Sequence, residues 1–284
     1  MAAALRHSAS LVLLRSSPAR GRASTSFEVL LLLRNAKRRT SFPSMWVFPG
    51  GVAEPSDISL SSTALRETFE EVGLTVGMEL PAGSTLSEVT EWRQRVYADP
   101  SSWASFTKWC GRAEAPLLAP FTKWTTPAFE KKRFTTAFFV GAVDEGWEAE
   151  GSVDGGEIVD HLWIAPDDAI ARHCRGHLAL MPPQLWMLSA LSGARSITDA
   201  MRIGRSLERL PTIEPELHAR SDDGTITLVL PWDEAHKAHP GEAGAAHRVS
   251  FVAPLGSSPV TLAISPLSTL RRCGLAGLAP DARM

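Results

Sequence analysis

The stretch from Phe48 to Val76 reads FPGGVAEPSDISLSSTALRETFEEVGLTV and carries the most informative pattern in the chain. Hydroxyl side chains at 61–63 are suited to capping the start of a helix, and Gly73 suits a left-handed stop just past its end. Before the helix, Pro49-Gly50-Gly51 predicts a tight loop whose backbone can approach a ligand closely. The stretch therefore predicts a glycine loop followed by one well-bounded helix.

The predicted helix has two chemically different faces. Glu67, Glu70 and Glu71 are spaced i, i+3 and i+4, which puts their three carboxylates on one face. The apolar side chains fall on the opposite face and are expected to pack inward: Leu65, Phe69 and Val72. Carboxylates this close repel one another and raise each other's pKa unless a cation lies among them. Such oxygen ligands suit Mg²⁺ or Mn²⁺, whereas a solvated acidic face is the alternative interpretation.

The flanking residues resemble the Nudix box, G-x5-E-x7-R-E-U-x-E-E-x-G-U, in which U is bulky and apolar. The matching residues are Gly51, Arg66, Glu67, Glu70, Glu71, Gly73 and Leu74. The spacing from Gly51 to Arg66 is one residue longer than the pattern, so the first acid of the box has no direct counterpart. Asp57 is the nearest equivalent and Glu54 is the other candidate. In the family, this acid mainly braces the box arginine.

The resemblance implies a fold and a set of roles. The fold would be a Nudix-type α/β/α sandwich of the α/β (α+β) class with a mixed sheet. Mg²⁺ or Mn²⁺ would be held by Glu67, Glu70, Glu71 and the Gly50 carbonyl, and Arg66 would orient the glutamates. The general base would be Glu71 or Glu157, because Nudix folds often supply a further carboxylate before a later strand; Asp154 is the fallback for Glu157.

Composition restricts the class of protein. The chain has 284 residues and a formal net charge of −2, which offers no general attraction to nucleic acid or to a membrane. No apolar run approaches the ~20 residues that span a bilayer. The three cysteines lack C-x-x-C spacing, which argues for a reducing compartment and against structural zinc: Cys110, Cys174 and Cys273.

Residues 1–27 allow two interpretations. They contain arginines and no acid, a composition that suits a mitochondrial transit peptide. Residues 8–14 also read as a strand, followed by a Pro/Gly/Ser loop and a second strand at 27–33. We favour the strand, which we expect at an edge of the sheet.

The rest of the chain divides into an insert, the second half of the sheet and an extension. Residues 79–127 predict a mainly helical insert covering the site, within a Nudix domain at 8–175. Strands are expected at 131–140 and 157–164, with a helix opening at Pro166. Residues 176–284 predict a C-terminal helical and β extension. Four insert tryptophans either stack on a base or fill a core: Trp92, Trp103, Trp109 and Trp124.

The order of motifs resembles one Nudix subgroup, the peroxisomal coenzyme A diphosphatases with a long insert. The motifs are Phe48-Pro49-Gly50-Gly51, Glu91-Trp92-Arg93, Trp124-x-Thr126-Pro127, Arg133-Phe134, Pro182-Pro183-Gln184 and Asp222-Asp223-Gly224-Thr225-Ile226. This resemblance implies metal-dependent cleavage of coenzyme A or acyl-CoA to 3′,5′-ADP and (acyl-)4′-phosphopantetheine. It also places Arg34 and Arg39 at the substrate, in the basic segment before the box.

The last three residues, Ala282-Arg283-Met284, are similar to the C-terminal tripeptide read by the peroxisomal import receptor. We therefore expect that receptor as a partner and the peroxisome as the location, with the mitochondrion as the alternative. Two other functions stay open. One is a Nudix hydrolase of another nucleoside diphosphate, such as ADP-ribose, NADH or capped RNA. The other is a non-catalytic nucleotide-binding Nudix module.

Overall fold

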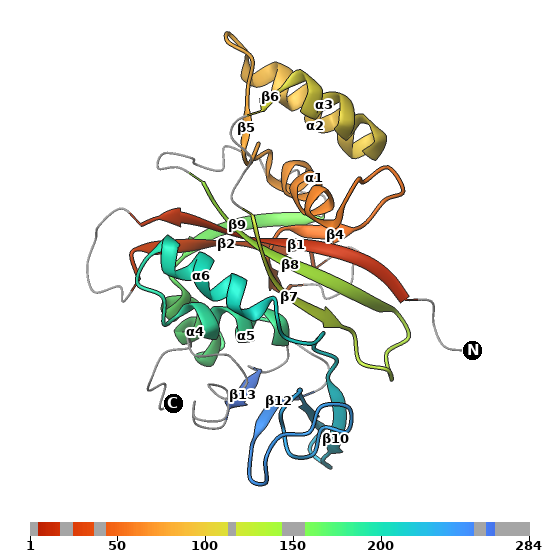
Figure 1. Ribbon diagram of the computed structural model, residues 1–284, viewed down its shortest axis with the longest axis vertical. Coiled ribbons are helices and arrows are strands. Elements are labelled where there is room, and N and C mark those ends of the chain that lie inside the picture. Colours follow the sequence, from red (N-terminus) through yellow and green to blue (C-terminus); the bar gives the residue numbers. More distant parts are fainter. Residues whose placement is uncertain are drawn as a thin grey trace.

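The computed structural model describes residues 5–17, 25–36, 44–112, 118–143, 157–252 and 260–264. Its main sheet has seven strands in the order β3-β2-β1-β8-β7, with β4 paired to β1 and β9 paired to β2 (Figure 1). The strands are β1 (Leu5–Ser16), β2 (Phe27–Arg34), β3 (Trp46–Val47), β4 (Gly50–Val52), β7 (Ala119–Thr125), β8 (Arg133–Val143) and β9 (Ile158–Ile164). β1 and β8 are parallel and the other pairs are antiparallel, so the sheet is mixed.

Both faces of the sheet are covered, which explains why β1 and β2 are apolar along most of their length. On one face, Leu11 and Leu13 of β1 pack with Ala64 and Val72 of α1 (Leu60–Val72). On the other face, Val12 packs in a core shared with three helices: α4 (Pro166–Cys174), α5 (Pro182–Leu191) and α6 (Ile197–Leu207). Figure 1 shows α1 on one side of the sheet and α4–α6 on the other. The predicted α/β/α sandwich is confirmed.

β1 is an inner strand, so its expected place at an edge of the sheet was wrong. It pairs with β2 and β4 along one side and with β8 along the whole of the other, from Leu5↔Arg133 to Arg15↔Val143. Residues 5–16 therefore form a strand in the middle of the sheet. The strand interpretation of this segment agrees with the structure, and only its position in the sheet differs.

The segment after α1 is helical but shorter than expected. It contains a small ladder and helices, namely β5 (Met78–Glu79), α2 (Leu86–Ala98), the 3₁₀ turn Pro100–Ser102, α3 (Trp103–Trp109) and β6 (Gly111–Arg112). β7 follows within the range expected for the insert, yet it pairs with β8 in the main sheet. A strand containing Pro120 and Lys123 carries too weak an apolar pattern to be separated from the insert by sequence.

The insert packs on α1, which changes the expected role of one residue. Phe69 lies in a separate aromatic cluster with Trp103 and Phe106, rather than against the sheet. Trp92 and Trp109 pack on this cluster, and Trp124 lies in the large core on the other face of the sheet, so all four insert tryptophans contribute to a core. α1 is thus buried on two sides, against the sheet and against the insert.

A second sheet lies beyond α4–α6 at the lower end of Figure 1. It is an antiparallel meander in the order β10-β11-β12-β13, made of β10 (Glu216–Arg220), β11 (Thr225–Val229), β12 (His247–Val252) and β13 (Thr261–Ile264). Val249 and Val260 share the large core with α5 and α6. The expected division at 175/176 therefore runs through one continuous core. Within the described residues, no helix has the length and apolar character needed to cross a membrane.

Candidate active site

The glycine loop, Pro49-Gly50-Gly51, is in close contact with β1 and α1. Gly50 pairs with Ser10, and a Cβ at Gly50 would come within 2.3 Å of the Ser10 Oγ and 2.4 Å of the Ala9 carbonyl oxygen. A Cβ at Gly51 would lie 2.4 Å from the Glu67 carboxylate. Only glycine leaves room for this approach, which lets the Gly50 amide donate a 2.9 Å hydrogen bond to Glu71 Oε2.

Arg66 organises the acidic helix from a buried position. Its side chain is 1% exposed and donates two hydrogen bonds to Asp57, of 2.9 and 3.0 Å. It also donates to Glu70 Oε1 at 2.7 Å and to the Val52 carbonyl at 3.0 Å, and it lies 3.0 Å from Glu67 Oε1. Burial alone would lower the pKa of Arg66, but these carboxylates outweigh it and raise the pKa well above its usual range.

Asp57, rather than Glu54, is the acid that braces the arginine. Its carboxylate also accepts hydrogen bonds from Thr63 Oγ1 at 2.9 Å and from the Glu54 amide at 3.0 Å. Burial raises the pKa of Asp57, but hydrogen bonds from Arg66, the Glu54 amide and Thr63 more than offset this and leave the pKa lowered. The extra residue in the loop before α1 is thus accommodated without losing the brace.

The three box glutamates carry raised pKa values. Burial raises the pKa of Glu67 to about 7 despite the adjacent Arg66. Burial also raises the pKa of Glu70, against the hydrogen bond from Arg66. Glu71 is affected more strongly, because burial and then the Glu67 charge raise its pKa well above the ordinary value. Negative charge is concentrated here beyond what Arg66 neutralises.

Arg34 and Glu157 complete the group from outside the box. Arg34, at the end of β2, forms an ion pair with Glu157, which directly precedes β9. The Asn35 amide donates to the Glu157 carbonyl at 2.8 Å, which fixes the two segments together. Both side chains act electrostatically on Glu71. The structure thus brings together Gly50, Arg34, Arg66, Glu67, Glu70, Glu71 and Glu157, whereas Arg39, Asp154 and 282–284 lie outside the described residues.

The donor chemistry of the cluster fits a hard divalent cation. Glu67 and Glu71 are half-buried carboxylates whose pKa values are raised by desolvation and by like charge, and a cation would relieve the repulsion. Among the described residues, no three His, Cys, Asp or Glu side chains already converge as a metal centre. Arg66 forms ion pairs with Glu67 and Glu70, which turns one oxygen of each carboxylate towards the guanidinium and away from a shared metal position.

Sequence reasoning missed the contribution of Arg93 from the insert. Its guanidinium donates to the Glu70 carbonyl at 2.8 Å and to the Glu71 carbonyl at 2.7 Å. These carbonyls belong to the last turn of α1, where acceptors lack helical partners and a cation is favoured. The insert therefore fixes the end of the helix that carries the site.

A pocket of about 220 Å³ opens beside Gly50 and Arg34. Its walls are mostly apolar and come from β3, β7, β8, α5 and the C-terminal sheet, which supplies Leu228 and Phe251. Trp124 and Gln184 also line it. No sequence spacing connects these residues, because they meet only through the sheet order and the packing of α5.

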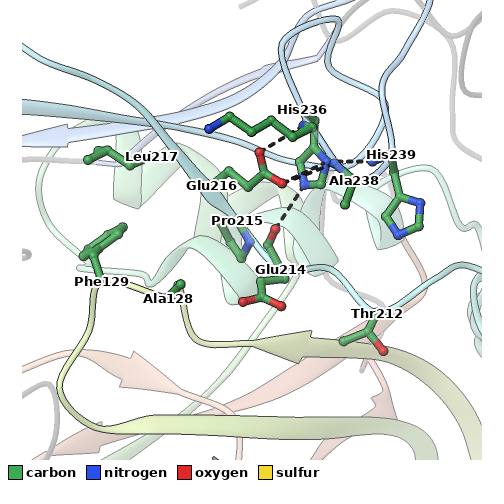
Figure 2. Close-up of a pocket in the computed structure, with 11 residues that line it drawn as sticks. Ala128, Phe129, Thr212, Glu214, Pro215, Glu216, Leu217, His236, Ala238 and His239 are labelled. Carbon is green, nitrogen blue, oxygen red and sulfur yellow. Dashed lines mark hydrogen bonds and ion pairs between the residues drawn. The ribbon is translucent and has the colours of Figure 1, made fainter. Parts of the chain in front are cut away.

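A larger, open cavity of about 680 Å³ lies at the junction of β10 with the loop after β11. Figure 2 shows Glu216 and His236 close together in it, with Phe129 and Leu217 at one side. The Glu216 carboxylate accepts hydrogen bonds from the Lys237 and Ala238 amides at 2.9 and 3.3 Å. None of the box residues lines this cavity, so we place the chemistry at the glutamate cluster.

Comparison with known proteins agrees with this geometry. A family profile described as the NUDT19 Nudix domain matches residues 55–191. The acyl-coenzyme A diphosphatase NUDT19 of Gallus gallus is 30% identical over 218 residues, which cover 69% of this chain and 57% of that protein. Its Homo sapiens counterpart is 27% identical over 227 residues, covering 70% and 57%.

The chain thus spans somewhat more than half the length of these curated relatives. Among solved structures, a NUDIX hydrolase from Alicyclobacillus acidocaldarius superposes with a TM-score of 0.59 at 24% identity. That match covers 70% of this chain and 96% of the other, which shows a shared fold. The chain therefore shares the fold of a NUDIX hydrolase, matches a Nudix domain profile over residues 55–191, and is similar in sequence to proteins named acyl-coenzyme A diphosphatase.

Proposed function

We propose that the protein hydrolyses the diphosphate linkage of coenzyme A or acyl-CoA, giving 3′,5′-ADP and (acyl-)4′-phosphopantetheine. The observation that carries the proposal is the half-buried glutamate cluster, braced by Arg66 and Asp57, beside the Gly50 loop. The choice of substrate is supported by the similarity to proteins named acyl-coenzyme A diphosphatase. Fold and box alone do not distinguish substrates.

Glu67, Glu70 and Glu71, with the Gly50 carbonyl, would hold Mg²⁺ or Mn²⁺. A divalent cation there supplies positive charge against the diphosphate oxygens and lowers the pKa of a water molecule. The protein's own contribution is orientation. Arg66 fixes Glu67 and Glu70, and the Gly50 amide fixes one oxygen of Glu71.

We assign proton acceptance from the attacking water to Glu157 and cation binding to Glu71. The Glu157 side chain is 43% exposed, so it can pass a proton on to solvent. Glu71 is half-buried and has one oxygen already held by the Gly50 amide, which suits a fixed ligand. In Glu157→Gln, we expect turnover to fall on the order of 10²-fold with the cation requirement unchanged. If Glu157→Gln instead needs more cation but keeps its kcat at saturating cation, Glu157 is the cation ligand and Glu71 the proton acceptor.

The substrate is tested by incubating the protein with coenzyme A, ADP-ribose and NADH, with and without Mg²⁺ or Mn²⁺, and identifying the products by mass. We expect cation-dependent release of 3′,5′-ADP from coenzyme A well ahead of cleavage of the other two. Preference for ADP-ribose or NADH would retain the diphosphate chemistry and reject the substrate. Absence of turnover on all three by folded protein would reject the hydrolase and favour a binding module.

A further inference from the structure

The pocket beside Gly50 and Arg34 contains two buried polar atoms that have no hydrogen-bond partner among the described residues. They are the Nε1 atom of Trp124 and the Oε1 atom of Gln184, and their residues are 4% and 6% exposed. Buried polar groups in folded proteins are nearly always paired, so two unpaired ones at one pocket suggest that a ligand supplies the partners. Arg34 Nε is a third such atom, at the end of the pocket nearest the glutamates.

The chemistry of these atoms defines what they can accept. The indole Nε1–H of Trp124 only donates, and the amide oxygen of Gln184 only accepts. A matching ligand must therefore offer an acceptor and a donor, as an amide group does. The remaining surface is mainly apolar, with aromatic walls such as Phe48, Phe138 and Phe251. The occupant is therefore an uncharged, largely apolar group with at least one hydrogen-bond acceptor and one donor, a description that an amide-containing chain fits.

The charges around the pocket distinguish the two halves of the proposed substrate. Among the described residues, the charged side chains that line it are Arg34, which is already paired with Glu157, and Glu130. The nucleoside half of coenzyme A carries a phosphomonoester, which needs cationic partners, and the described part of the lining offers only the already paired Arg34. The other half is an uncharged arm with two amides, and it needs none.

We propose that this pocket binds the pantetheine arm of the substrate, with Trp124 donating to an amide carbonyl and Gln184 accepting from an amide N–H. Leu228 and Phe251 make the C-terminal sheet part of the substrate site, as the wall facing β7 and α5. The assignment rests on the proposed function, because it takes coenzyme A as the substrate.

The two reaction products separate the halves and serve as probes. We would measure binding of 4′-phosphopantetheine and of 3′,5′-ADP by calorimetry to the wild-type protein, Trp124→Phe and Gln184→Leu. Phenylalanine keeps an aromatic ring and removes the N–H, and leucine keeps the size and removes the acceptor. Each substitution should weaken the binding of 4′-phosphopantetheine about three- to tenfold, which is the usual effect of losing one neutral hydrogen bond. The binding of 3′,5′-ADP should not change. KM for coenzyme A should rise with kcat nearly constant.

Trp163→Phe is the matched control. Trp163 Nε1 is also buried without a partner in the described chain, but its ring lies against Arg15 and does not line the pocket. This variant should bind both products as the wild type does. Thermal unfolding of all variants identifies any that fail to fold, and Gln184→Leu tests the proposal independently of the Trp124–Trp186 ring contact.

The outcomes are separable from those of the proposed function. Weaker 3′,5′-ADP binding with unchanged 4′-phosphopantetheine binding would assign the pocket to the adenine nucleotide and overturn the proposal. Unchanged binding of both products by folded variants would also overturn the pocket assignment. If the wild-type protein still cleaves coenzyme A in that case, the proposed function stands. A wild-type protein that does not cleave coenzyme A would overturn the function and this assignment together.

Discussion

Arg66 and Asp57 form a buried, doubly hydrogen-bonded ion pair that ties the loop after β4 to the first half of α1. Their side chains are only 1% and 2% exposed. Removing one partner leaves the other charge buried without compensation, so we expect Asp57→Ala to lower the free energy of unfolding by about 3–5 kcal/mol. Urea unfolding measures the change.

Glu54→Gln is the control for Asp57→Ala, because the structure uses the Glu54 backbone, rather than its side chain, to contact Asp57. Its unfolding free energy should stay within about 0.5 kcal/mol of the wild type. Equal destabilisation by the two substitutions would contradict the assignment of Asp57 as the brace.

Glu71→Gln should separate stability from activity. The glutamine removes a half-buried charge that lies near Glu67 and Glu157, so the unfolding temperature should stay the same or rise. Hydrolysis of the diphosphate should nevertheless fall on the order of 10²-fold, because a cation ligand is lost. Calorimetry and product analysis measure the two effects.

The same pair of measurements on Glu91→Gln provides the reference, since Glu91 is 60% exposed on the insert. We expect no change in either quantity. A Glu71→Gln protein that is fully active would remove Glu71 from the proposed metal site.

Arg93→Ala should loosen the end of α1, because it deletes the hydrogen bonds to the Glu70 and Glu71 carbonyls. Hydrogen bonds from charged donors contribute about 1.5–3 kcal/mol, and we expect a loss of that order in the free energy of unfolding. Hydrolysis should also decline, because the displaced turn carries two of the site glutamates.

The matched control for Arg93 is Arg95→Ala, two residues along α2. Arg95 is 62% exposed and its ion pair with Glu91 is long, at 3.9 Å. Exposed pairs of this kind contribute about 0–1 kcal/mol. If both alanine substitutions had the same small effect, Arg93 would not support the helix.

His247 should make stability fall in mild acid. It accepts a 2.9 Å hydrogen bond from Trp186 Nε1 at its Nε2 atom, and its Nδ1 lies 2.6 Å from the Pro231 carbonyl, an arrangement that requires the neutral ring. Burial lowers its pKa to about 4, against the favourable effects of the Pro231 carbonyl and of Asp233. The unfolded chain takes up this proton near pH 6.5, whereas the folded chain does not until about pH 4.

The stability contributed by neutral His247 is therefore complete above about pH 6.5 and is lost as the pH falls towards 4, by roughly 3 kcal/mol in total. Urea unfolding at pH 7.5, 6.0 and 4.5 measures the slope. His247→Gln keeps a hydrogen-bonding amide without this titration and should show a shallower slope. Parallel slopes in the two proteins would show that His247 is not the group responsible for the loss of stability.

Local patterns predicted the site more completely than the fold around it. Helical spacing grouped Glu67, Glu70 and Glu71, and Gly73 ends α1 with φ of 72°, as its position indicated. Spacing could not choose between Asp57 and Glu54, since both lie in an irregular loop. The choice depends on which carboxylate faces Arg66 in three dimensions.

The features that the sequence analysis placed wrongly or did not find depend on packing between segments that are distant in the chain. The apolar pattern of α1 does not reveal that Phe69 is covered by the insert while Val72 is covered by the sheet. The sequence analysis did not place strand β10 within the extension, because its sequence, ELHAR, is largely exposed and lacks an alternating apolar face. The pocket residues Trp124 and Gln184 meet only after β7 and α5 have packed.

The long parallel pairing of β1 with β8 also bears on how the chain is made. Ser8 and Thr136 share a 2.7 Å hydrogen bond across 128 residues of sequence. At about 5–20 residues per second, a ribosome exposes β1 on the order of ten seconds before its partner strand exists. During that interval the apolar run 11–14 has an unpaired edge, which is a hazard for aggregation. Synthesis of this protein should therefore depend on chaperones that shield the nascent N-terminal strand until β8 has been translated.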